Sequence, residues 1–241
     1  MYYIIYIIEF YSIYYKFNYI IYKILYIIYN IMLSTKLPKK NELSGGANTN
    51  INGKKFENKT MNEYIIKNGR LITYDTANKK KATPNDTYYV LSINNANCNC
   101  DILYFRQSAF KSYIKFHYGI ELFRHPDEAY IVINNRVPLF TEDITIKILE
   151  KKNQNSEGSC ETKLWASPAL KEEYAIMFLD FVSIIKIEYG LCVNQFFKDK
   201  IKNSLKYQIL TKILSNNNIY ILYGDDEDYL MQLNNWIYHC A

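Results

Sequence analysis

The chain has 241 residues, of which 49% are hydrophobic and 22% are charged, with only 8 Gly and 5 Pro. This composition excludes a disordered or fibrous protein and fits one globular domain with a sizeable core and an extension. The formal net charge of +5 excludes a histone-like tail protein but allows a polyanionic partner.

Residues 1–31 differ in composition from the rest, because 11 Ile and 10 Tyr fill most of the segment. Glu9, Lys16 and Lys23 interrupt it, and Tyr prefers the membrane interface, so we do not expect a true membrane span. Three interpretations stay open: an interfacial helix, a hydrophobic helix docked on a partner, or translated upstream sequence ahead of a start at Met32. The third is favoured, which leaves residues 32–241 as the folded domain and membrane association through residues 1–31 uncertain.

The first half of this domain predicts a mixture of helices and short strands. A small, polar loop at residues 44–50 leads into a helix over residues 56–66, with Glu57 in its first turn. Residues 88–93 and 102–105 are rich in β-branched and aromatic side chains and predict two strands around an Asn/Cys turn. Residues 108–118 predict a helix rich in aromatic side chains.

Two longer strands follow. Residues 128–134 predict a strand that ends in a turn over residues 134–136. Residues 143–152 alternate so that three isoleucines share one strand face, and the same period of two carries Glu150 and Lys152 onto that face.

The C-terminal part predicts mainly helices. Residues 168–189 are apolar almost all round, as expected of a long helix packed against a sheet. Residues 195–214 predict a basic amphipathic helical region, residues 219–223 a short strand and residues 227–238 a closing helix. The predicted fold class is therefore α/β, with a C-terminal helical region.

Two carboxylates mark the ends of neighbouring predicted strands. Asp127 begins the strand at residues 128–134, and Glu150 ends the next one. Converging carboxylates suit Mg²⁺, which keeps waters and phosphate oxygens as its other ligands. Lys152, on the face of Glu150, can orient or deprotonate an attacking water and offset charge on a phosphate. The pattern favours metal-assisted phosphodiester hydrolysis.

Several short motifs in this order carry a family resemblance. They are Gly45-Gly46, Phe56-Glu57, Pro126-Asp127-Glu128-Ala129, Ile148-Leu149-Glu150-Lys151-Lys152-Asn153-Gln154, Glu157-Gly158-Ser159 and Lys163-Leu164. Over residues 44–238 the chain resembles type II restriction endonucleases of the PD-(D/E)XK nuclease superfamily. The resemblance implies a restriction-endonuclease-like core, with a central sheet of four mixed strands flanked by helices, that hydrolyses double-stranded DNA with Mg²⁺.

The same resemblance implies roles for individual residues. Asp127 and Glu150 would bind the metal, Lys152 would be the catalytic lysine, and Glu57 an additional catalytic acid. Alternatives remain: Glu57 as an acid stabilised by a helix N-terminus, Lys151 in place of Lys152 if a β-bulge intervenes, and Glu128 in place of Asp127. Structure-specific nucleases, such as resolvases and repair enzymes, belong to the same superfamily, and a membrane-associated, non-catalytic protein with a degenerate nuclease fold is a rival from another class.

DNA contacts are expected from basic and amide side chains near the predicted site. Gln154 matches a supporting glutamine of some superfamily members, and phosphate contacts are expected from Lys54, Lys55, Lys151 and Lys163. Further candidates are Lys79, Lys80 and Lys81 and the series Lys198, Lys200, Lys202 and Lys206. Scission of both strands at a palindromic site favours a homodimer, and a restriction enzyme implies a companion DNA methyltransferase.

Other polar residues carry weaker signals. The odd number of cysteines and the lack of a secretory leader favour reduced thiols in an intracellular protein, cytoplasmic or associated with DNA. Cys98 and Cys100 lack the spacing usual for a zinc pair. His125, next to Pro126, is expected to be structural, and the acidic turn Asp225-Asp226-Glu227 is expected to be a solvated loop rather than a cation site.

Overall fold

The computed structural model describes residues 46–74, 83–94, 99–135, 143–154, 159–179 and 185–238. The predicted extension at residues 1–31, its boundary with the domain, and Lys79, Lys80 and Lys81 lie outside these ranges. Residues 47–241 form one compact unit. In the described part, no helix is both long and apolar enough to cross a membrane.

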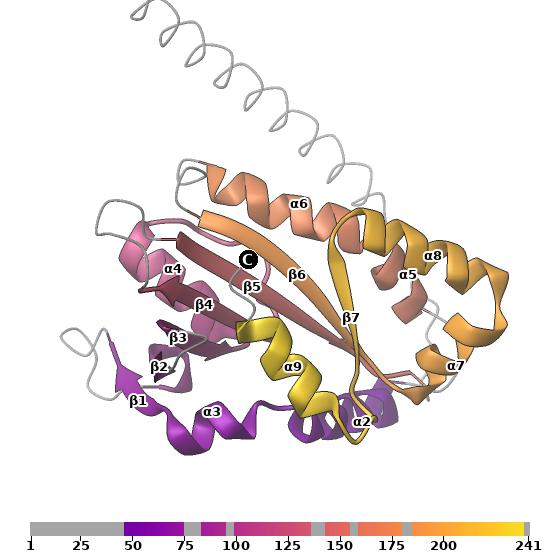
Figure 1. Ribbon diagram of the computed structural model, residues 1–241, viewed down its shortest axis with the longest axis horizontal. Coiled ribbons are helices and arrows are strands. Elements are labelled where there is room, and N and C mark those ends of the chain that lie inside the picture. Colours follow the sequence, from indigo (N-terminus) through magenta and orange to yellow (C-terminus); the bar gives the residue numbers. More distant parts are fainter. Residues whose placement is uncertain are drawn as a thin grey trace, which may run out of the picture. The chain divides into compact units, whose positions relative to one another are not determined.

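The centre of this unit is a seven-stranded sheet in which the spatial order of the strands follows the sequence, β1-β2-β3-β4-β5-β6-β7 (Figure 1). The strands are β1 (Arg70–Thr73), β2 (Thr87–Asn94), β3 (Asn99–Arg106), β4 (Glu128–Asn134), β5 (Asp143–Lys152), β6 (Ile185–Val193) and β7 (Ile219–Tyr223). Strands β1 to β5 are antiparallel neighbours, whereas β5, β6 and β7 run parallel. The sheet is therefore mixed, with its change of direction at β5.

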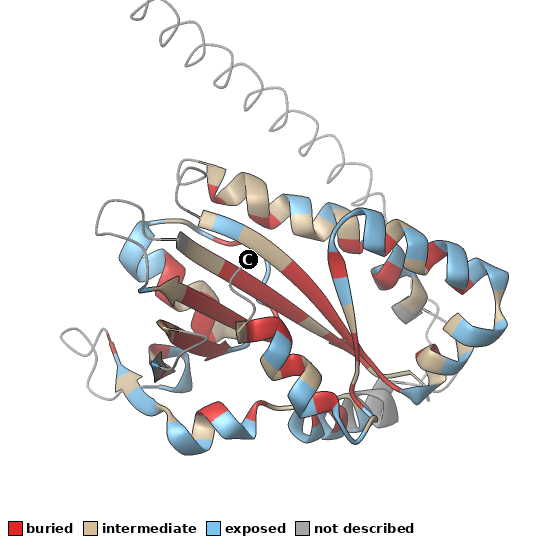
Figure 2. Ribbon diagram, viewed as in Figure 1, coloured by how far each residue is buried: buried red, intermediate tan, exposed pale blue. Residues whose placement is uncertain are grey.

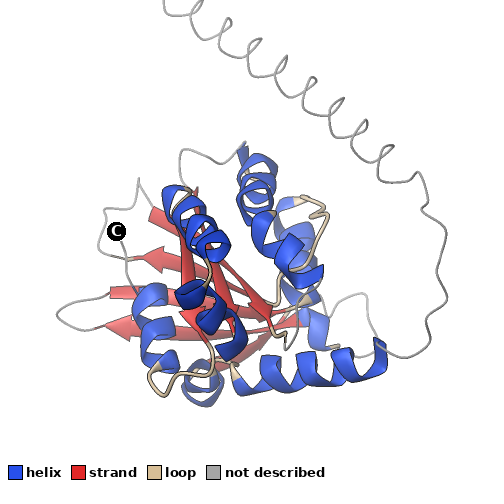
Figure 3. Ribbon diagram, turned by 90° about the vertical axis from the view of Figure 1, so that its right-hand side faces the viewer, coloured by secondary structure: helices blue, strands red, loops and turns tan. Residues whose placement is uncertain are grey.

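Helices cover both faces of the sheet (Figure 3). They are α2 (Gly46–Lys59), α3 (Glu63–Asn68), α4 (Ser108–Tyr118), α5 (Ser159–Trp165), α6 (Ser167–Met177), α7 (Gln195–Asn203), α8 (Leu205–Asn216) and α9 (Tyr229–Tyr238), with the short 3₁₀ turn η1 (Pro84–Asp86) before β2. The strands are rich in β-branched and aromatic residues that fit a pleated, buried surface. The predicted α/β class, with a mixed sheet flanked by helices, is confirmed.

The period of two along each strand divides the core into two clusters. One face of the sheet packs Phe105, Ile131, Ile146 and Ile148 against α4, α6, α7 and α8. The other packs Tyr104, Tyr130 and Leu149 against α2, α3 and α9. The central strands are buried along most of their length (Figure 2). We name these the α4/α6 face and the α2/α9 face.

Most predicted elements are confirmed, including the helix at residues 108–118 and the strands at residues 128–134 and 143–152. The loop predicted over residues 44–50 is wrong from Gly46 on, where helix α2 already begins, and the helix predicted over residues 56–66 is wrong in its bounds. Helix α2 begins at Gly46 and ends at Lys59, and a new helix starts after Asn62, whose side chain accepts the Ile65 N–H at 3.2 Å. Glu57 therefore lies near the end of α2, and the interpretation that it is an acid at a helix N-terminus is wrong.

The long helix predicted over residues 168–189 is also wrong. Helix α6 ends at Met177, and strand β6 begins at Ile185. Residues 185–189 alternate apolar and charged side chains, as a strand does, but this stretch is too short to stand out at the end of an otherwise apolar helical pattern. The region predicted as helical over residues 195–214 consists of two helices, because the extended backbone of Ser204 separates α7 from α8.

Candidate functional site

Asp127, Glu150 and Lys152 meet where β4 begins and β5 ends. The Lys152 Nζ donates to Glu150 Oε2 at 2.6 Å and lies 3.7 Å from Asp127 Oδ2. All three side chains are between 10% and 24% exposed, so they are sheltered but open to solvent. The structure thus brings together the three residues for which the sequence predicts metal binding and catalysis.

The strand register explains this convergence. Glu128 of β4 pairs with Leu149 of β5, and β5 runs without interruption beside β6, where Glu150 pairs with Leu191 and Lys152 with Val193. Leu191 and Val193 belong to the core of the α4/α6 face. Because paired residues share a face, Glu150 and Lys152 emerge at the edge of that face without the β-bulge that would exchange Lys151 and Lys152.

Lys151 and Glu128 form a second ion pair on the opposite, α2/α9 face. Their side chains are each 2% exposed, and Lys151 Nζ donates to Glu128 Oε1 at 2.7 Å. The Lys151 ammonium also donates to the carbonyls of Thr60 and Glu57, at 3.0 and 3.2 Å. Enclosed in this way, Lys151 does not lie where a phosphate could reach it, and Glu128 does not face Lys152. The placement of both residues is structural.

Glu57 is linked to the site by Gln107, a residue that the sequence analysis does not single out. Its carboxylate accepts a hydrogen bond from Gln107 Nε2 at 3.2 Å, and the Gln107 N–H donates to the Asp127 carbonyl at 3.1 Å. Gln107 has φ 45° and ψ −126°, a backbone conformation that is strained for a residue with a side chain and is often found near functional sites. No sequence motif marks Gln107, because the strain arises from the turn between β3 and α4.

Burial acts against the charge of Glu150. Burial raises the pKa of this carboxyl, Lys152 lowers it and the Asp127 charge raises it again, with a net upward shift. The net upward shift means that Lys152 only partly offsets burial and the charge of Asp127, so a bound cation would further stabilise the ionised carboxylate. Asp127 and Glu150 supply the hard oxygen donors that Mg²⁺ prefers. Among the described residues, however, no group of three His, Cys, Asp or Glu side chains forms a fuller metal cluster. The residues fit an ion that keeps several water or phosphate ligands.

The raised pKa of Glu150 predicts how stability depends on pH. A group with a folded pKa above its unfolded value contributes its full stability below the unfolded pKa, near 4.5 here, and loses it as the pH rises through the folded pKa. We therefore expect wild type in EDTA to lose free energy of unfolding relative to Glu150→Gln as the pH rises above about 4.5. Urea unfolding from pH 4 to pH 8 measures this, with exposed Glu172→Gln as control. Parallel profiles for wild type and Glu150→Gln would show that burial does not govern this carboxyl.

Most of the predicted DNA-contacting residues lie around the same edge. Lys163, exposed in α5, is close enough for its charge to lower the pKa of Glu150. Gln154 follows the end of β5, and its carbonyl accepts Asn194 Nδ2 at 2.9 Å. Lys54 and Lys55 are exposed on α2, and Lys55 lines a depression of about 360 Å³ together with Asn153 and Asn194. This depression borders the residue that follows Lys152.

Other candidates are occupied elsewhere. Asp225 binds Lys59 at 2.6 Å, Lys198 binds Asp226 at 2.5 Å, and Lys206 pairs with Glu161, so the acidic turn and part of the C-terminal lysine series form internal ion pairs.

His125 is exposed beside Pro126. The thiols of Cys100 and Cys192 are buried, and burial raises the pKa of Cys192 to about 12, so this thiol keeps its proton at neutral pH. Cys98, Cys160 and Cys240 carry no described side chain.

No family model, curated protein or solved structure matches the chain. The class that the structure defines is therefore an α/β protein with a seven-stranded mixed sheet flanked by helices.

Proposed function

We propose that the protein is a Mg²⁺-dependent DNA endonuclease that hydrolyses phosphodiester bonds, and that it is a type II site-specific enzyme with a restriction-endonuclease-like core. The observation that carries the proposal is the convergence of Asp127, Glu150 and Lys152 on one face at one edge of the sheet. Strands β3, β4, β5 and β6 lie next to one another in that order, with antiparallel pairing up to β5 and parallel pairing between β5 and β6. This arrangement supports the four-stranded mixed core that the family resemblance implies.

The chemistry follows from the positions of the three side chains. Asp127 and Glu150 would hold the cation, which supplies positive charge to a phosphate oxygen and to the attacking water when bound. The Lys152 ammonium is 2.6 Å from Glu150, so it lies where it can orient that water and offset the charge that develops on the phosphate. Glu57, held by Gln107, would help to position groups from the side of α2.

The substrate and partners follow from the charges around this edge. Lys54, Lys55 and Lys163 are exposed and available to duplex phosphates, and Gln154 is placed just beyond the strand that carries Lys152. Neutralising phosphates supplies much of the affinity of proteins for DNA. A homodimer would place two such sites on a palindromic duplex, and a companion methyltransferase would protect the host DNA, so we place the activity inside the cell.

A cleavage assay tests the proposal. The full-length protein is incubated with plasmid, phage and branched DNA, in Mg²⁺ or in EDTA, beside Glu150→Gln protein as a control for contaminating nuclease. Discrete Mg²⁺-dependent fragments that the variant does not produce would support a site-specific enzyme. Cutting restricted to branched DNA would support a resolvase or repair nuclease instead. No cutting of any DNA by folded protein would reject the enzyme and favour a binding role.

A further inference from the structure

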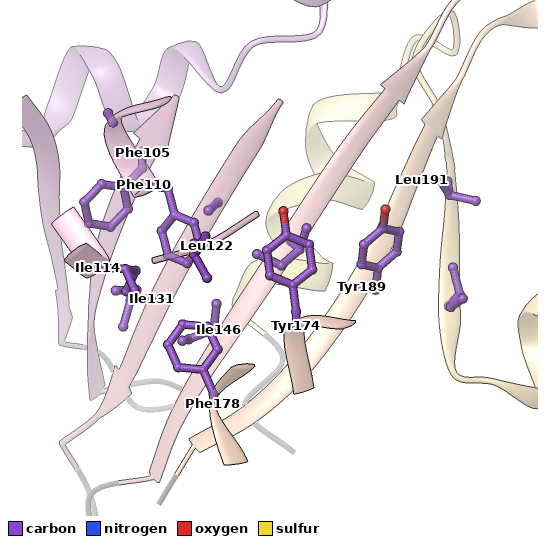
Figure 4. Packing of buried hydrophobic residues seen from close by; sticks show 14 of the residues in the cluster. Phe105, Phe110, Ile114, Leu122, Ile131, Ile146, Tyr174, Phe178, Tyr189 and Leu191 are labelled. Atoms are coloured by element: carbon purple, nitrogen blue, oxygen red, sulfur yellow. The ribbon is translucent and has the colours of Figure 1, made fainter. Parts of the chain in front are cut away.

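Two tyrosines lie directly behind the carboxylate site, on the same α4/α6 face. Tyr189 of β6 pairs with Ile148 of β5, two residues before Glu150 on the same strand face. Tyr174 of α6 packs on it, with ring centroids 6.5 Å apart. Figure 4 shows the two rings side by side, with their hydroxyl oxygens directed the same way.

Neither hydroxyl has a hydrogen-bond partner among the described residues. Tyr174 is 2% exposed and Tyr189 is fully buried, so neither is satisfied by bulk water. A buried hydroxyl without a partner destabilises the fold, because its hydrogen bonds to water are lost without replacement. A phenylalanine side chain has nearly the same shape and carries no hydroxyl that needs a partner. Two unpartnered hydroxyls in one place therefore indicate that a ligand of the site accepts hydrogen bonds from them when it is bound.

The charges that act on these hydroxyls include those of the candidate site, together with Glu173 near Tyr174 and the opposing charge of Arg124. Burial raises the pKa of both phenols, and the negative charges of Glu150 and Asp127 raise them further. Both phenols therefore keep their protons and act as donors, because loss of a proton beside two carboxylates is strongly disfavoured. An oxygen atom that enters the space beside Glu150 is an acceptor that both hydroxyls could share.

We propose that Tyr174 and Tyr189 are positioning residues for the cation of this site, donating hydrogen bonds to water molecules in its coordination shell. The inference rests on the proposed function in that Asp127 and Glu150 are taken to hold the cation. Mg²⁺ keeps several waters when two carboxylates bind it, and groups that fix such outer ligands tune affinity for the ion. The two hydroxyls supply fixed donors on the protein side, opposite the open edge where DNA would approach.

The test measures Mn²⁺ binding to the full-length protein by calorimetry, without DNA. In the double variant Tyr174→Phe/Tyr189→Phe the dissociation constant for Mn²⁺ should rise about 10- to 100-fold. The melting temperature in EDTA should stay the same or rise, because an unpartnered hydroxyl is removed. Tyr74→Phe is the matched control: this buried tyrosine donates to the Asn85 carbonyl at 2.8 Å, and its loss should lower the melting temperature without affecting Mn²⁺.

Two outcomes would overturn the inference: a double variant that binds Mn²⁺ within twofold of wild type, or a wild-type protein that binds no Mn²⁺. The nuclease proposal and the proposal for the tyrosines can fail independently. If the wild type cuts DNA but its Mn²⁺ affinity does not depend on the tyrosines, only the role of the tyrosines fails. If Mn²⁺ affinity depends on the tyrosines but no DNA is cut, the assigned reaction fails and the cation site stands.

Discussion

Glu150→Gln protein should lose Mg²⁺-dependent cleavage by on the order of 10³-fold or more, and Asp127→Asn and Lys152→Met should do the same. A cation and a positioned ammonium stabilise the transition state of phosphate hydrolysis by several kcal/mol, and each 1.4 kcal/mol is about a factor of ten in rate. Binding of duplex DNA should persist in the two carboxylate variants, because removing a negative charge near a phosphate backbone does not weaken attraction.

Initial rates on plasmid DNA and a gel-shift titration of the same duplex measure the two effects. The matched controls are Lys186→Met, an exposed lysine on β6, and Glu121→Gln, an exposed acid that pairs with Lys115. Both should cut at the wild-type rate. Wild-type cleavage by any of the three site variants would show that the catalytic group lies elsewhere. Inactive controls would show that the loss does not depend on the site.

Replacement of either partner of the buried pair Glu128 and Lys151 should destabilise the protein by about 3–5 kcal/mol, since each single change leaves the other charge buried and alone. The pair is nearly inaccessible to water. Glu128 accepts from the hydroxyls of Tyr104 and Tyr130 at 2.8 and 2.6 Å, and Lys151 binds the carbonyls at the end of α2. Loss of the lysine therefore also releases this end of the helix.

Urea unfolding of Lys151→Met, Glu128→Gln and the double variant measures the coupling between the two charges. The double variant should lose clearly less than the sum of the single variants, because no uncompensated ion remains buried. Lys115→Met, which breaks an exposed pair with Glu121, should have almost no effect. Strictly additive single losses would mean that the two charges do not stabilise each other.

Strand β5 illustrates what the sequence predicts well. Its three isoleucines at every second position indicate both the strand and the face on which Glu150 and Lys152 emerge. Strand β6 illustrates the opposite case. Its second half, residues 189–193, is buried on both faces and shows no alternation, whereas in its first half Lys186 and Glu188 alternate with apolar residues. That short alternation is a strand signal that the helix prediction overlooked. The edge strand β1 is only four residues long and was not predicted.

The candidate site also contains some residues that the sequence predicts and others that it does not. Asp127, Glu150 and Lys152 are predictable because two neighbouring antiparallel strands place a start and an end together. The bond between Gln107 and Glu57 depends on how α2 packs against the sheet, which no local pattern encodes. Tyr174 and Tyr189 also come from separate elements, and their alignment becomes visible only when α6 is laid on β6.

The chain has two adjacent acids where β4 begins and two adjacent lysines at the end of β5, and one of each lies on either side of the sheet. Substitutions at neighbouring positions should therefore affect different properties of the protein. In a screen of random variants that scores soluble yield and cleavage separately, changes at Asp127 and Lys152 should give well-expressed, inactive protein. Changes at Glu128 and Lys151 should reduce the yield itself. Neighbouring codons would then report on two different properties, folding and activity.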